Sequence, residues 1–274
     1  MIPNKPLGDG LEIPQLGFGT FQIPPEATQE TVEKALSVGY RHIDTAAIYR
    51  NEEGVGAAIA ASGLSRDEVF VTTKLWNSDQ GGEKAHQAIG KSLSRLGLEY
   101  VDLYLIHWPR PATGLQVETW SALQEMQTSG LSRSIGVSNF RVEDLEMLLE
   151  AGGLQPSVNQ IELHPYLQQS ELRAWHADHR MLTEAWSPLA QGEVLADPVI
   201  TSIATNHGKT PGQVVLRWHV LLGNVVIPKS VTSSRIVENF EIFDFDLTAD
   251  ELGALQDLDK GHRTGPDPDS FENG

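Results

Sequence analysis

The chain contains no cysteine and is short of positive charge. The absence of cysteine from its 274 residues excludes disulfide bonds, thiolate metal ligands and thiol nucleophiles. Twenty lysine and arginine residues stand against 37 aspartate and glutamate residues, which gives a net charge of −17. This charge opposes attraction to phosphate backbones and to anionic membrane surfaces, so we expect no nucleic-acid and no membrane partner. An anionic cofactor would need a local basic site.

Long hydrophobic runs are also missing. No stretch is long enough to span a bilayer, and the first residues, MIPNKPLGDG, lack the basic and apolar regions of a signal peptide. We therefore expect a cytoplasmic protein. The length fits one α/β barrel domain over 1–274, in which 261–274, rich in Gly, Pro and Asp, forms an irregular tail.

What the sequence does contain is a repeated alternation of short apolar runs with longer stretches of helical spacing. Eight such units predict the α/β class and a (β/α)8 TIM barrel, with an open doubly wound sheet as the alternative. An N-terminal β-hairpin is expected over 3–14, and extra helices near the C-terminus over 197–207 and 248–258. The eight expected strands cover 15–19, 41–46, 69–75, 101–107, 132–138, 157–163, 182–187 and 225–229.

Motifs of other nucleotide-binding and metal-binding proteins are incomplete. The stretches at 17–22 and 54–59 begin like Rossmann fingerprints, but both lack the third glycine. The histidines do not form an obvious metal-binding set, and the first place to look would be Glu162 with His164. We expect no metal.

Polar side chains follow three successive predicted strands. Asp44 belongs to the second strand and Tyr49 comes five residues later, while Lys74 and His107 lie near the ends of the third and fourth. Singly, each has a structural interpretation, as a helix cap, half-buried packing, a solvated strand end or a loop anchor. Because the carboxyl ends of barrel strands meet on one face, their joint occurrence predicts an active site.

These four residue types suit the reduction of a carbonyl group. A phenol, with a pKa of about 10, is a poor acid near neutral pH unless a cation stabilises its phenolate. Lys74 supplies that cation and Asp44 keeps it charged, while His107 donates a hydrogen bond to the carbonyl oxygen. The group has no electron store, so the reaction needs an external reductant such as a nicotinamide.

Three further segments make the chain resemble the aldo-keto reductases. They read GYRHIDTAAIY at 39–49, SIGVSNF at 134–140 and IPKSVTSSRIVENF at 227–240. Among these enzymes the chain is similar to short bacterial members, the 2,5-diketo-D-gluconate reductases. The resemblance implies a monomer that uses NADPH, with Tyr49 as the acid, Lys74 and Asp44 tuning it, and His107 orienting the carbonyl.

The resemblance also implies which residues hold NADPH across the barrel mouth. Around the nicotinamide and pyrophosphate these are Gly19, Thr20, Ser138, Asn139, Gln160, Trp186, Ser187, Leu189 and Gly192. Around the 2′-phosphate and adenine they are Lys229, Ser230, Val231, Thr232, Arg235, Glu238 and Asn239. Two cations near a helix start suit a phosphate, which favours NADPH over NADH. The alternatives are core packing for Trp186 and a surface charge for Arg235.

The substrate pocket implied by the same comparison is largely aromatic. It comprises Phe21, Ile48, Trp76, Trp108 and Gln191. The short tail predicts an open pocket with broad selection of substrates, and Arg50, next to Tyr49, leaves attraction of anionic substrates open.

Two other functions remain: a cofactor-binding regulatory protein without turnover, resembling potassium-channel β subunits, and a barrel isomerase or hydrolase that uses no nicotinamide.

Overall fold

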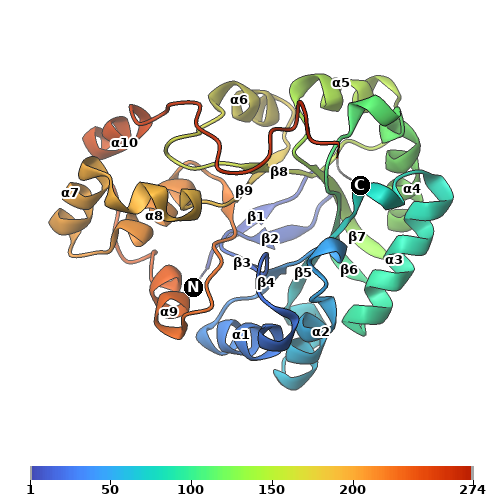
Figure 1. Ribbon diagram of the computed structural model, residues 1–274, viewed down its shortest axis with the longest axis horizontal. Coiled ribbons are helices and arrows are strands. Elements are labelled where there is room, and N and C mark those ends of the chain that lie inside the picture. Colours follow the sequence, from blue (N-terminus) through green and yellow to red (C-terminus); the bar gives the residue numbers. More distant parts are fainter. Residues whose placement is uncertain (1, 273–274) are drawn as a thin grey trace.

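A computed structural model describes residues 2–272 and contains a sheet of eight strands, each parallel to its neighbours. The strands follow one another around the sheet in chain order (Figure 1). They are β3 (Phe18–Gly19), β4 (His42–Asp44), β5 (Phe70–Leu75), β6 (Val101–Ile106), β7 (Ser132–Ser138), β8 (Val158–Glu162), β9 (Leu182–Trp186) and β10 (Val225–Val226).

The sheet closes on itself between its first and last strands. Leu16 forms a parallel bridge with Val226, and the Gly17 amide donates to the Val226 carbonyl at 2.9 Å. Gly17 allows this close approach, because a Cβ atom there would lie 2.5 Å from the His42 ring. The predicted barrel is confirmed, and the open sheet is not what forms.

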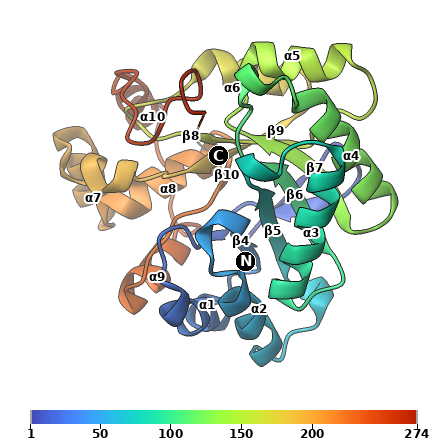
Figure 2. The ribbon, with the colours of Figure 1, turned by 45° about the vertical axis from the view of Figure 1, so that its right-hand side comes forward.

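Helices surround the barrel (Figures 1 and 2). The apolar faces of these helices pack on the outer side of the strands and form the larger of two hydrophobic cores. The surrounding helices are α1 (Pro25–Val38), α2 (Glu52–Ala61), α3 (Gly82–Leu96), α4 (Gln116–Thr128), α5 (Val142–Glu150), α6 (Ser170–Asp178), α8 (Pro211–Leu221) and α9 (Ser233–Phe240). None in the described part of the chain is long and apolar enough to cross a membrane.

The predicted additions to the barrel are also present. Strands β1 (Asn4–Pro6) and β2 (Glu12–Pro14) pair antiparallel as a hairpin, and α7 (Pro198–His207) and α10 (Ala249–Gln256) are the extra helices. Short 3-10 helices, which periodicity did not predict, join several elements. They are η1 (Ala47–Tyr49), η2 (Arg66–Glu68), η3 (Asn77–Asp79), η4 (Pro111–Thr113) and η5 (Ala190–Ala196).

The first and last barrel strands are shorter than predicted. Strands β3 and β10 contain two residues each, whereas 15–19 and 225–229 were expected. Pro228 has no N–H group to donate to a neighbouring strand, although its carbonyl accepts a hydrogen bond from Gly19 at 3.1 Å. Lys229 therefore lies in a loop after the strand.

The interior of the barrel is divided between apolar and polar side chains. The hairpin covers one end, where its Leu7 and Ile13 join a second hydrophobic core with residues of β5, β6, β8 and β10. Polar side chains of β4, β5, β8 and β9 are also buried, among them His42, Asp44, Lys74, Gln160 and Glu184. Buried polar groups need partners, and their partners define the candidate site.

Candidate active site

The centre of the site is a buried ion pair between neighbouring strands. Lys74 on β5 donates to the two carboxylate oxygens of Asp44 on β4 at 2.7 and 2.8 Å, and to the Thr45 carbonyl at 2.8 Å. Burial acts to lower the pKa of Lys74, but the nearby charges of Asp44 and Tyr49 outweigh it and raise this pKa. Lys74 is therefore held in its charged form.

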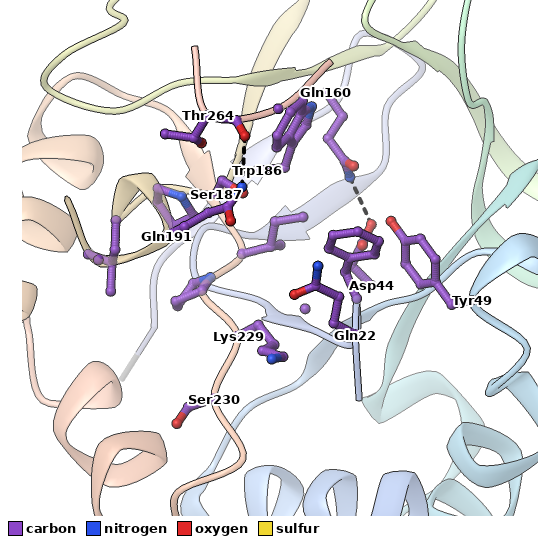
Figure 3. A pocket seen from close by; sticks show the side chains of 18 of the residues that line it. Gln22, Asp44, Tyr49, Gln160, Trp186, Ser187, Gln191, Lys229, Ser230 and Thr264 are labelled. Atoms are coloured by element: carbon purple, nitrogen blue, oxygen red, sulfur yellow. Dashed lines mark hydrogen bonds between the residues drawn. The ribbon is translucent and has the colours of Figure 1, made fainter. Parts of the chain in front are cut away.

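Tyr49 is placed beside this pair by the 3-10 helix η1. The Lys74 ammonium lies 5.2 Å from the centre of the phenol ring, and Figure 3 shows Tyr49 and Gln160 next to Asp44. Burial raises the pKa of Tyr49, and the charge and hydrogen bond of Lys74 offset only part of that rise. The expected effect of Lys74 is present, but desolvation of the phenol is larger. Tyr49 therefore keeps its proton at neutral pH.

His107 follows β6 and faces Tyr49. Their ring centres are 5.8 Å apart and nearly perpendicular, and the Trp76 ring lies 5.2 Å away on another side. Burial lowers the pKa of His107 well below its usual value, so the imidazole is neutral. Its Nδ1 has no hydrogen-bond partner within residues 2–272. A neutral imidazole has one N–H to donate to a ligand.

The ends of β7, β8 and β9 add amide groups and an indole. Asn139 donates to the His107 carbonyl at 2.9 Å and accepts a hydrogen bond from the Trp186 indole at 2.9 Å. Gln160 donates to Asp44 at 2.8 Å and to Glu184 at 2.9 Å. Gln160 is therefore tied to the ion pair through Asp44, and Asn139 is tied to His107 and Trp186.

A cleft of about 1060 Å³ opens over these residues. Most residues singled out from the sequence line it: Gly19, Phe21, Asp44, Ile48, Tyr49, Trp76, His107, Trp108, Ser138, Asn139, Gln160, Trp186, Ser187, Leu189, Gln191, Gly192, Lys229, Ser230, Arg235, Glu238 and Asn239. Four do not. Thr20 and Lys74 are buried behind the lining, where the Thr20 hydroxyl donates to the Asp44 carbonyl, while Val231 and Thr232 are exposed outside it.

The sequence as a whole decides the family. Residues 15–260 match the profile of the Aldo/keto reductase family. The chain belongs to this family. It is 55% identical to an aldo-keto reductase of Mycolicibacterium smegmatis, over 99% of this chain and 98% of that protein. It is 54% identical to methylglyoxal reductase DkgA of Yersinia pestis, with 99% and 98% coverage.

Solved structures agree with this assignment. A variant of Gox0644 crystallised in complex with NADPH superimposes on the chain with a TM-score of 0.95, at 47% identity and 99% coverage of both chains. The predicted resemblance to aldo-keto reductases is therefore confirmed. As a member of this family, the protein is an oxidoreductase that reduces carbonyl groups.

The reductase has two cations in its cleft, and both suit an anionic cofactor. Lys229 and Arg235 are exposed, and neither forms an ion pair with another residue in 2–272. In a chain with a net charge of −17, two unpaired cations facing one cleft form the local basic site that an anionic dinucleotide requires. In Figure 3 Lys229 and Ser230 lie away from Tyr49.

The C-terminal segment of the reductase lies across the cleft, which the sequence did not indicate. Thr264, Gly265, Pro266 and Phe271 line it, and we call residues 261–272 the strap. Glu162, at the end of β8, accepts hydrogen bonds from the Thr264 amide and hydroxyl at 2.6 and 2.7 Å. A buried carboxylate therefore holds the short tail against the cleft, so the tail forms part of the pocket wall, and the expected broad selection stays a prediction.

Other lining residues were not singled out from the sequence as site residues. Gln22, Pro188, Leu195, Thr210, Pro211, Gly212, Ile227 and Pro228 complete the wall, mostly from loops. The place suggested for a metal is occupied by the strap anchor, where His164 bonds Glu162 at 3.1 Å. Within residues 2–272 no three His, Asp or Glu side chains are grouped as metal ligands.

Gly265→Ala should loosen the strap. A Cβ atom at this residue would lie 2.4 Å from the Trp186 ring, so the strap or the indole must move. An overpacking cost of about 1 kcal/mol would make tryptic cleavage after Arg263 roughly fivefold faster, measured by mass spectrometry. The matched control is Gly253→Ala in α10, where no atom lies within 4 Å. Equal cleavage rates in wild type and Gly265→Ala would contradict the close contact.

Proposed function

We propose that the protein reduces aldehydes and ketones to alcohols with NADPH, with Tyr49 as the general acid. The observation that carries this proposal is the buried Asp44–Lys74 pair beside a protonated Tyr49 and a neutral His107, at the bottom of a cleft with two free cations. When bound, NADPH supplies the hydride that adds to the carbonyl carbon.

The residues of the chain provide the rest of the reaction. The N–H of His107 donates a hydrogen bond to the carbonyl oxygen and holds it near the phenol. Tyr49 transfers its proton to that oxygen as negative charge develops there, which completes the alcohol. Lys74 stabilises the resulting phenolate, and Asp44 compensates the buried charge of Lys74. Tyr49 regains a proton from solvent before the next turnover.

The cleft offers suitable groups for each part of the cofactor. Ser138, Asn139 and Gln160 line the cleft and would bind the nicotinamide carboxamide, and Trp186 would stack on the ring. Lys229 and Arg235 would bind the 2′-phosphate by charge-assisted hydrogen bonds. A regulatory protein that binds cofactor without turnover is the alternative, but the complete set of four catalytic side chains favours an enzyme.

We propose that the preferred substrates are uncharged. Aromatic rings of Phe21, Trp76, Trp108 and Phe271 line the cleft, and its only cations within residues 2–272 are the two assigned to the cofactor. Phe271 of the strap packs on Trp108 with ring centres 4.4 Å apart. Methylglyoxal, which the name of the Yersinia pestis relative gives as its substrate, is uncharged as well.

That the protein acts as a cytoplasmic monomer stays a prediction.

Tyr49→Phe should abolish most of the turnover. Loss of the general acid lowers kcat by at least about 10²-fold, while NADPH affinity stays nearly unchanged because the phenol ring remains. Turnover is followed by the absorbance of NADPH and affinity by fluorescence. Tyr100→Phe, outside the cleft, is the control and should keep wild-type turnover. Near-normal turnover of Tyr49→Phe would exclude this residue as the acid.

Arg235→Ala should weaken NADPH much more than NADH. A charge-assisted hydrogen bond to phosphate contributes about 1.5–3 kcal/mol, so the Kd for NADPH should rise by roughly ten- to a hundredfold. NADH lacks the 2′-phosphate and serves as the internal control. Fluorescence titration without substrate measures both constants. Equal losses for the two cofactors would refute the assignment of Arg235.

The charge preference can be measured with one matched pair of ketones. Ethyl benzoylformate and benzoylformate share the reacting ketone and the aromatic ring, but only the acid carries a charge. We expect kcat/KM for the ester to exceed that for the acid by at least about tenfold, since an anion buried without a partner loses solvation. Preference for the acid would contradict this proposal. It would point to Arg50, which is exposed next to Tyr49, as an anion partner.

A further inference from the structure

A second carboxyl group is buried beside the Asp44–Lys74 pair. Glu184 on β9 has no exposed surface. Its Oε2 accepts a hydrogen bond from Gln160 Nε2 at 2.9 Å, and the same nitrogen donates to Asp44 Oδ2 at 2.8 Å. One amide group thus joins two carboxyl groups inside the barrel.

This arrangement fixes the direction in which Gln160 faces the cleft. A side-chain amide has two N–H donors, and both are directed at carboxyl oxygens. A flipped amide would place its oxygen against the Asp44 carboxylate, which would repel it. Gln160 therefore presents its oxygen, an acceptor, to the cleft, and an NH2 group is the matching ligand. The carboxamide of nicotinamide carries such a group.

Glu184 also contributes a variable charge. It lies near Asp44 and His42 on β4, Lys74 on β5, Gln160 on β8 and, at the cleft, Tyr49. Burial and the charge of Asp44 raise the pKa of Glu184 to about 8. Burial lowers the pKa of His42 to about 3, so His42 does not compensate Glu184 when it ionises.

We propose that Glu184 is a positioning residue of the hydride-transfer site, which holds the Gln160 oxygen toward the nicotinamide carboxamide and adds negative charge beside Lys74 when it ionises. This inference rests on the proposed NADPH-dependent function. It predicts that the hydrogen bond matters for cofactor binding and the charge matters for the proton step. Two substitutions separate these effects.

Glu184→Leu removes both the acceptor and the charge, whereas Glu184→Gln keeps an acceptor oxygen and cannot ionise. Glu184→Leu should bind NADP+ about tenfold more weakly, measured without substrate by quenching of tryptophan fluorescence, because Gln160 is no longer held. Glu184→Gln should bind NADP+ within about twofold of wild type at pH 6.5. Wild-type affinity in Glu184→Leu would overturn the positioning role.

The charge is tested by the pH profile of alcohol oxidation, which needs the Tyr49 phenolate. We call the rise of the oxidation rate with pH, as the phenolate forms, the alkaline limb of the profile. Ionised Glu184 disfavours the phenolate, so Glu184→Gln should shift this limb to lower pH by at least about half a unit. A limb that coincides with wild type would overturn the effect of the charge.

Thermal unfolding gives a second readout. Because the pKa of Glu184 is raised on folding, its contribution favours the fold at low pH and is lost as pH rises toward 8, and Glu184→Gln should lack this decline.

Glu52→Gln is the control for a buried carboxyl group outside the site. Glu52 accepts a hydrogen bond from Thr73 at 2.6 Å and pairs with Arg95 at 2.6 Å. Its substitution should lower stability without changing NADP+ affinity or the alkaline limb. Wild-type protein that turns over no carbonyl and binds no NADP+ would overturn the proposed function itself. If the wild-type protein is active and the Glu184 variants keep its NADP+ affinity and its pH profile, only the inference about Glu184 is overturned.

Discussion

The ion pair of Asp44 and Lys74 sets the conditions for everything around it. Removing two charges from water costs several kcal/mol per ion, and only close contact with good hydrogen bonds offsets this cost. Adjacent parallel strands supply that contact, because β4 and β5 bring the two side chains to 2.7 Å without a flexible loop. Tyr49, Gln160 and Thr20 are then arranged around a charge pair that cannot move without exposing or isolating a charge.

The interior of the barrel separates stability from chemistry. Apolar side chains of the hairpin and of β6 seal one end, where no ligand is needed. Polar side chains occupy the part that opens on the cleft, where Gln160 is fixed by partners on two other strands. Desolvation then raises the pKa of Tyr49 and lowers the pKa of His107, and both groups stay neutral: Tyr49 keeps its proton, and His107 keeps one N–H to donate.

Sequence reasoning located the groups that follow regular strands. Asp44, Lys74 and His107 could be assigned because strand ends converge in any barrel, and Tyr49 because it follows one such end. Glu184 escaped notice because one acidic residue in a strand looks like a solvent-facing one until the strand is placed. The strap escaped because its contact with Glu162 joins residues about a hundred positions apart, without periodicity to mark it. Long-range contacts of irregular chain leave no local pattern.

The anchor of the strap has a consequence for how such enzymes diversify. Glu162 binds the strap mainly through the backbone N–H groups of Thr264 and Gly265, which nearly every amino acid provides. Phe271, on the same strap, contacts Trp108 in the cleft and takes no part in the anchor. The atoms that attach the strap to Glu162 therefore differ from the Phe271 side chain, which faces the substrate cleft. Evolution or an engineer can replace the side chain at Phe271 while the hydrogen bonds that hold the strap persist.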